Sequence, residues 1–97
     1  MSYSLKVFGA AWCPSCTVLK ANLNGANVPF DYVDCDSEDG MVEAQSLGVR
    51  GLPTTVVTLN GQTVRTIVGL QPNSEYTKYE TAKMVTEELP QEATLNG

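Results

Sequence analysis

The chain is 97 residues long, carries a net charge of −5 at pH 7 and contains no histidine. This length predicts a single domain with a thin core. The acidic balance, with six scattered basic residues, argues against nucleic acid as a partner, and the missing histidine excludes Ser–His–Asp and Cys–His catalysis.

The sequence shows no pattern typical of export or membrane anchoring. Its N-terminus has no basic stretch followed by an apolar region, and no run of about 18 apolar residues occurs. Three cysteines are an odd number and too few for a secreted disulfide scaffold. We therefore expect a cytoplasmic protein without a membrane partner, whose cysteines do chemistry or pack in the core.

The first half of the chain predicts the order strand, helix, strand, helix. Residues 5–8 form a short apolar run that is typical of a buried strand, and residues 13–25 have apolar side chains at helical spacing. Residues 28–33 are rich in strand-forming side chains. Acidic residues and a serine at 36–39 favour the start of a second helix, which Gly48 ends.

The second half predicts a hairpin followed by a helix. Residues 54–59 are strongly β-branched, Asn60-Gly61 is a strong turn signal, and residues 62–68 form the return strand. Pro72-Asn73-Ser74 opens a last helix. Its apolar stripe contains Tyr76, Tyr79, Ala82, Val85 and Leu89.

The element order is therefore βαβα followed by ββα, which is an α/β fold. The first part is a parallel crossover unit, and the second adds an antiparallel hairpin with a covering helix. We expect a four-stranded mixed sheet flanked by three helices in one domain over residues 1–89, with a solvated tail at 90–97.

Two cysteines lie three residues apart at the predicted junction of the first strand and the first helix. Residues at this spacing share one helix face, so the sulfurs of Cys13 and Cys16 can bond to or release one another. Free N–H groups and the helix dipole would stabilise a thiolate on Cys13, the predicted nucleophile. Pro14 suits the first helical position, and Cys16, deeper in the helix, would act as the resolving thiol.

Structural interpretations of this pair are weaker. A zinc site normally needs four Cys or His ligands, and this chain has three Cys and no His, so we predict no metal. A disulfide that spans two residues closes too small a loop to stabilise the fold much.

Pro53 stands directly before the β-branched run. It either marks the start of a strand, as prolines commonly do, or forms a cis peptide bond that brings backbone beside the cysteines. In the second case, the backbone of Leu52 could pair with an extended substrate segment.

The chain resembles the thioredoxin family in four separate segments. These are Trp12-Cys13-x-x-Cys16, Val33-Asp34-Cys35-Asp36, the loop Gly48-Val49-Arg50-Gly51-Leu52-Pro53-Thr54, and Asn60-Gly61 with Val68-Gly69. The resemblance covers about residues 5–88 and implies a thioredoxin-like fold with a cis Pro53.

The chain departs from the family's usual pattern at several positions. Pro14-Ser15 between the cysteines is more like a glutaredoxin, Val7 replaces a buried Asp, and Gly9 replaces an aromatic residue. Arg50 is the one basic residue near Pro53, which disfavours glutathione as the main reductant. The chain looks closest to a short thioredoxin, similar to the compact redoxins of bacteriophages, with glutaredoxin-like features.

The resemblance implies a thiol–disulfide oxidoreductase that carries electrons to protein disulfides. It implies no bound cofactor beyond a redox-active Cys13–Cys16 disulfide, with NADPH acting indirectly through a thioredoxin reductase, and substrates such as ribonucleotide reductase. We expect a monomer. The predicted substrate-binding residues are Trp12, Pro14, Leu52, Pro53, Gly69 and Leu70.

Two other functions stay open at this point. The chain could be a glutaredoxin-like hydrogen donor for ribonucleotide reductase, or a non-catalytic subunit that docks a larger enzyme. Cys35 is interpreted as a small buried hydrophobe, with a regulatory or dimer-forming thiol as the alternative. The acidic cluster around Asp36 is interpreted as a solvated helix start rather than a cation site.

Overall fold

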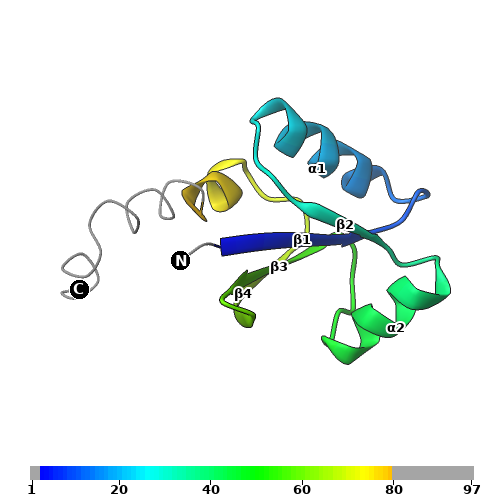
Figure 1. Cartoon of the computed structure of the whole chain (residues 1–97). Helices are drawn as coiled ribbons and strands as arrows, with labels where there is room; N and C mark the ends of the chain where they lie inside the picture. Colours follow the sequence, from blue (N-terminus) through cyan, green and yellow to red (C-terminus); the bar gives the residue numbers. More distant parts are fainter. Residues whose placement is uncertain (1–2, 80–97) are drawn as a thin grey trace.

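A computed structural model describes residues 3–79 of the chain (Figure 1). The later positions of the predicted last helix and the predicted tail at 90–97 lie outside the described residues, so the division into a domain at 1–89 and a tail stays a prediction. Within residues 3–79, no helix is long and apolar enough to cross a membrane.

Four strands form one mixed sheet, as predicted. They are β1 (Tyr3–Gly9), β2 (Asp31–Asp34), β3 (Thr54–Leu59) and β4 (Gln62–Val68). The strand order is β2-β1-β3-β4, with β1 and β2 parallel and the β1–β3 and β3–β4 pairs antiparallel. The carboxyl ends of β1 and β2 therefore meet at the same edge of the sheet.

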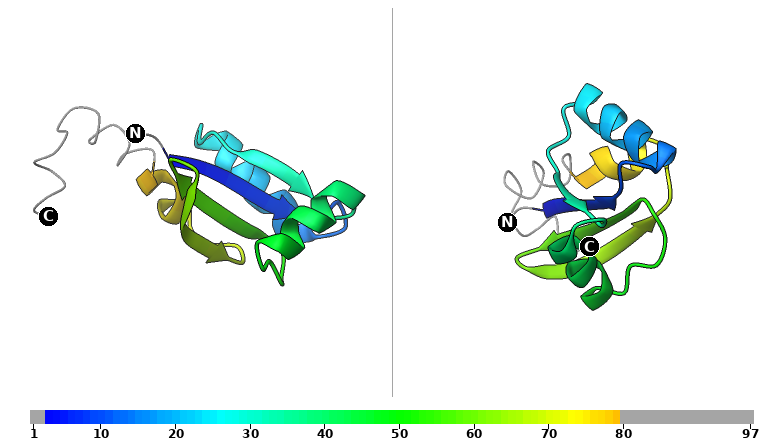
Figure 2. Two further views of the ribbon diagram at one scale, coloured as in Figure 1. Left: turned by 60° about the horizontal axis from the view of Figure 1, so that its bottom comes forward. Right: turned by 90° about the vertical axis from the view of Figure 1, so that its right-hand side faces the viewer.

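Helices cover both faces of this sheet. Helix α1 (Pro14–Gly25) and helical residues 74–79 lie on one face, and α2 (Glu38–Ser46) lies on the other (Figures 1 and 2). Leu19 and Leu23 of α1 pack with Tyr76 in the larger core cluster, whereas Ala44 of α2 packs with Phe8 and Val56 in the smaller one. The structure confirms the predicted α/β fold.

The second strand starts later than the sequence pattern predicts. We expected a strand over residues 28–33, but β2 begins at Asp31. The Val28 amide instead donates to the Leu23 carbonyl at 2.9 Å, after Asn27 turns the chain with a positive φ of 59°. Pro29 has no N–H to donate to a strand ladder, so this segment closes the end of α1 and Val28 becomes a core side chain.

Helix α2 buries its small residues rather than its large ones. Of its apolar residues Met41, Val42, Ala44 and Leu47, only Ala44 is buried, together with Gly40. Ser37 caps the helix: its Oγ accepts from the Gly40 amide at 3.0 Å and donates to the Asp34 carbonyl at 2.7 Å. This cap draws the first turn of α2 tightly against the end of β2.

The close approach at Gly40 predicts a loss of stability in Gly40→Ala. A Cβ there would overlap the Asp34 carbonyl oxygen and lie 2.8 Å from Ser37 Oγ. We expect the free energy of unfolding to fall by about 1–3 kcal/mol despite the better helix propensity of alanine. Urea denaturation followed by circular dichroism measures this change. Gly25→Ala is the control, because its Cβ would meet nothing within 4 Å; equal effects of the two substitutions would contradict the prediction.

Candidate active site

The cysteine pair lies where β1 runs into α1. Cys13 is the N-cap of the helix, with extended backbone (φ −96°, ψ 108°), and Pro14 is the first helical residue. The Cys16 amide donates to Cys13 Sγ at 3.2 Å, and the two sulfurs form a disulfide with 5.3 Å between the Cα atoms. The predicted strand-to-helix placement of the pair is confirmed, and the Cys13 sulfur lies in the field of the helix N-terminus.

The two cysteines differ in their access to solvent. Cys13 keeps 6% of its surface exposed, whereas Cys16 is fully buried. Both pack against Ala10 and Leu52 in a small apolar cluster. An incoming thiol or disulfide therefore meets Cys13 first.

The loop before β3 stands beside the cysteines. The peptide bond between Leu52 and Pro53 is cis, which decides between the two interpretations of Pro53 in favour of the second. Leu52 packs against the cysteine cluster and also against the Phe8 cluster on the α2 face. The Gly69 amide donates to the Pro53 carbonyl at 2.8 Å, so the end of β4 lies beside the Pro53 loop.

Two exposed apolar side chains lie next to the cysteine pair and the Pro53 loop in the chain or through a backbone hydrogen bond. Trp12 is 68% exposed and Leu70, next to Gly69, is 41% exposed. The indole Nε1 of Trp12 donates to Asp36 Oδ1 at 3.1 Å, which ties the ring to the loop before α2. No local pattern signals this contact, because Trp12 and Asp36 are 24 residues apart and meet only where β1 and β2 end together.

The acidic segment before α2 serves the local backbone. The Asp36 amide donates to Asp34 Oδ1 at 2.9 Å, and the helix starts at Glu38 after its Ser37 cap. Asp34, Asp36 and Glu38 are exposed. Their arrangement confirms the interpretation of this cluster as a solvated helix start.

We expected Cys35 to be a small buried hydrophobe, but its side chain is only half-buried. The side chain packs against the Phe8 cluster, and its amide donates to the Gly9 carbonyl at 2.8 Å. Burial, followed by the negative charges of Asp34 and Asp36, raises the pKa of the Cys35 thiol. The thiolate is the reactive form, so Cys35 is a weak nucleophile at neutral pH.

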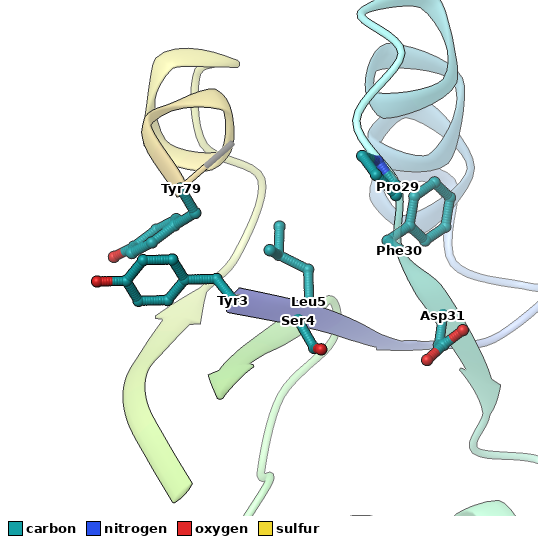
Figure 3. A pocket seen from close by; sticks show the side chains of 7 residues that line it. All are labelled: Tyr3, Ser4, Leu5, Pro29, Phe30, Asp31 and Tyr79. Atoms are coloured by element: carbon teal, nitrogen blue, oxygen red, sulfur yellow. The ribbon is translucent and has the colours of Figure 1, made fainter. Parts of the chain in front are cut away.

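A hollow of about 140 Å³ lies at the opposite end of β1 (Figure 3). Tyr3 and Tyr79 face one another there, with their ring centroids 5.3 Å apart, and Phe30 lies across from them. Because β1 runs from Tyr3 at this end to Gly9 at the cysteine end, the hollow is separate from the cysteine site.

Two sulfur atoms that alternate between a disulfide and a dithiol exchange electrons with the thiols and disulfides of other molecules. The fold and this site thus define the class of dithiol–disulfide exchange proteins. The Thioredoxin family model matches residues 3–82, and the chain belongs to the thioredoxin family.

Individual thioredoxins are similar to this chain over most of its length. The thioredoxin of Malassezia sympodialis is 34% identical over 73 residues, which cover 68% of each protein. That of Griffithsia pacifica is 28% identical over 71 residues, which cover 67% of this chain and 63% of the relative. The solved structure of a mutant thioredoxin from Halobacterium salinarum has 28% identity and a TM-score of 0.73, covering 84% of this chain and 75% of that one.

The chain thus spans about two thirds of the length of its curated relatives. Thioredoxins are dithiol–disulfide oxidoreductases without a bound cofactor, and this chain is a thiol–disulfide oxidoreductase with Cys13 and Cys16 as its Cys-x-x-Cys pair. The resemblance stated from the sequence motifs is confirmed.

Proposed function

We propose that this chain is a cytoplasmic, monomeric reductant of protein disulfides, with Cys13 as the attacking thiolate. Cys13 attacks one sulfur of a substrate disulfide, and the other substrate sulfur leaves as a thiolate. Cys16 then attacks Cys13 Sγ, which releases the second substrate thiolate and leaves the Cys13–Cys16 disulfide. Two electrons pass to the substrate, and two protons from solvent complete its thiols.

The difference in burial between the two cysteines carries this assignment. A protein disulfide can reach Cys13 at the surface, whereas Cys16 can be reached only by a sulfur that is already attached to Cys13. Cys16 is therefore protected from forming its own mixed disulfide with solvent thiols.

The surroundings of Cys13 favour a protein substrate over glutathione. Trp12 and Leu70 present apolar surface, and Leu52 packs against the cysteines, where its backbone can pair with an extended segment. Glutathione carries two carboxylates, which basic side chains usually meet. Trp12, Pro14, Leu52, Pro53, Gly69 and Leu70 are the proposed contact residues.

The oxidised chain needs two electrons to return to the dithiol. We assign their delivery to a flavin-dependent thioredoxin reductase that draws on NADPH, and ribonucleotide reductase is a proposed recipient. The test is NADPH oxidation with insulin as the disulfide substrate, comparing such a reductase with glutathione plus glutathione reductase. Faster turnover with the thioredoxin reductase is expected.

The opposite preference would overturn this proposal and favour the glutaredoxin-like alternative. Turnover by neither reductant, with a folded chain, would favour the docking subunit. The double variant Cys13→Ser, Cys16→Ser separates that case, because docking survives the loss of both sulfurs and reduction does not.

A further inference from the structure

The resolving sulfur lies in surroundings that disfavour its charged form. Cys16 is fully buried and packs with Ala10, Cys13 and Leu52. When the disulfide opens, the bonding electron pair stays on Cys16 Sγ as a thiolate. A buried charge without a hydrogen-bond donor is costly. The backbone amide of Cys16 donates to Cys13 Sγ and not to the Cys16 sulfur.

A phenol hydroxyl lies in the same space as this sulfur. Tyr32 of β2 is the direct neighbour of Val7 in the parallel β1–β2 pair, two residues before Gly9. The Tyr32 hydroxyl lies 2.6 Å from the point where a Cβ on Gly9 would stand, and Cys16 Sγ lies 3.0 Å from that point. The hydroxyl and the sulfur therefore cannot be farther apart than these two distances together.

The absence of a side chain at position 9 makes this arrangement possible. A Cβ at 2.6 Å from the Tyr32 oxygen would overlap it, and the same Cβ would press on Cys16. Gly9 thus leaves room for the hydroxyl to reach the sulfur from the end of β1. Val7, fully buried two residues earlier on the same strand, offers no polar group of its own.

Burial and the nearby carboxylates keep the Tyr32 hydroxyl protonated, although a cation also lies on its ring. Lys20 of α1, one turn after Cys16, holds its Nζ 4.0 Å from the Tyr32 ring centroid. Burial raises the pKa of Tyr32, and the negative charges of Asp34 and Asp36 raise it further. At neutral pH the hydroxyl is a donor and not a base.

We propose that the Tyr32 hydroxyl donates a hydrogen bond to the Cys16 thiolate during disulfide exchange. In the reduction of this chain, an incoming thiolate bonds to Cys13 Sγ, the Cys13–Cys16 bond breaks, and the O–H of Tyr32 meets the sulfur that leaves. In the reduction of a substrate, the same bond favours the thiolate with which Cys16 attacks the mixed disulfide. Tyr32 keeps its proton in both directions. Solvent takes up the Cys16 proton before Cys16 attacks, and in the reverse direction solvent returns a proton to the Cys16 thiolate. This inference rests on the exchange proposed above.

The test is the reaction of the reduced chain with Ellman's reagent, an aromatic disulfide, in a Cys35→Ser background. Cys13 releases one coloured aromatic thiolate in a phase that depends on reagent concentration, and Cys16 releases the second in a phase that does not. In Tyr32→Phe, we expect an unchanged first phase and a second phase that is slowed about tenfold, because a hydrogen bond to a charged sulfur is lost. The pH midpoint of the second phase should rise by about one unit.

Two further variants make the result specific. Tyr3→Phe removes a hydroxyl at the far end of β1 and should leave both phases unchanged. Gly9→Ala keeps the hydroxyl but displaces it, and should slow the second phase as Tyr32→Phe does. A second phase with the native rate and pH midpoint in Tyr32→Phe would overturn the role of the hydroxyl. Release of only one equivalent by the chain with native Tyr32 would instead overturn the dithiol exchange itself.

Discussion

Replacing Cys13 with serine should abolish disulfide reduction, with a loss on the order of a thousandfold or more. A serine hydroxyl is not ionised at neutral pH and cannot hold a substrate as a mixed disulfide. Cys13 caps α1 and is the more exposed of the two cysteines, so the buried Cys16 cannot replace it. Insulin reduction with dithiothreitol as the electron source measures the loss.

Replacing Cys16 with serine should separate the two steps. Cys13 still attacks the substrate, but the mixed disulfide cannot be resolved from within, so the covalent complex accumulates and can be weighed by mass spectrometry. Cys35→Ser is the control and should keep the native rate, because the raised pKa of Cys35 keeps it a thiol. A covalent complex in Cys13→Ser and none in Cys16→Ser would reverse the assignment of attacking and resolving sulfurs.

The second large effect is expected for stability, in Phe8→Ala. Phe8 is fully buried on the α2 face of β1, where it packs with Ala44 and Val56. Removing the ring leaves a cavity, and we expect a loss of about 3–5 kcal/mol in the free energy of unfolding. Because small domains have only about 5–15 kcal/mol in total, the variant should be close to unfolded at room temperature. Chemical denaturation followed by far-ultraviolet circular dichroism measures the change.

Two control substitutions test whether the loss of stability comes from the buried ring. Val64→Ala removes an exposed side chain from β4 and should change the free energy of unfolding by less than about 1 kcal/mol. Phe8→Leu keeps most of the buried volume and should fall between the two variants. If Phe8→Ala were no more destabilised than Val64→Ala, the Phe8 cluster could not be a core of this protein.

Elements with strong local signals were predicted closely from the sequence. The hairpin has the predicted bounds, because Asn60 and Gly61 both adopt the positive φ values, 55° and 84°, that a tight turn between twisted strands requires. Helix α1 begins at Pro14 and ends at Gly25, where its cap and its terminating glycine place it. These signals act within a few residues of the chain, so tertiary packing did not change them.

Elements that depend on contacts between distant segments were predicted less well. The start of β2 was misplaced because Val28 closes α1 instead of extending the sheet. Burial in α2 does not follow side-chain size, because the close approach of the Asp34 carbonyl leaves no room for a side chain at Gly40. Hydrophobicity alone cannot predict how near two elements come.

Local patterns along the chain were enough to predict the class of chemistry and the two sulfurs that perform it. The placement of Cys13 and Cys16 at a helix start follows from local spacing. The resemblance of the loop around Pro53 to the thioredoxin family predicted the fold and the cis peptide bond. The tertiary structure alone decided which groups surround those sulfurs. Asp36 holds Trp12, and Tyr32 lies over Gly9 beside Cys16, because the parallel pairing of β1 and β2 brings their carboxyl ends to one edge of the sheet. Such contacts join residues far apart in the chain, and register and packing distance fix them rather than any local pattern.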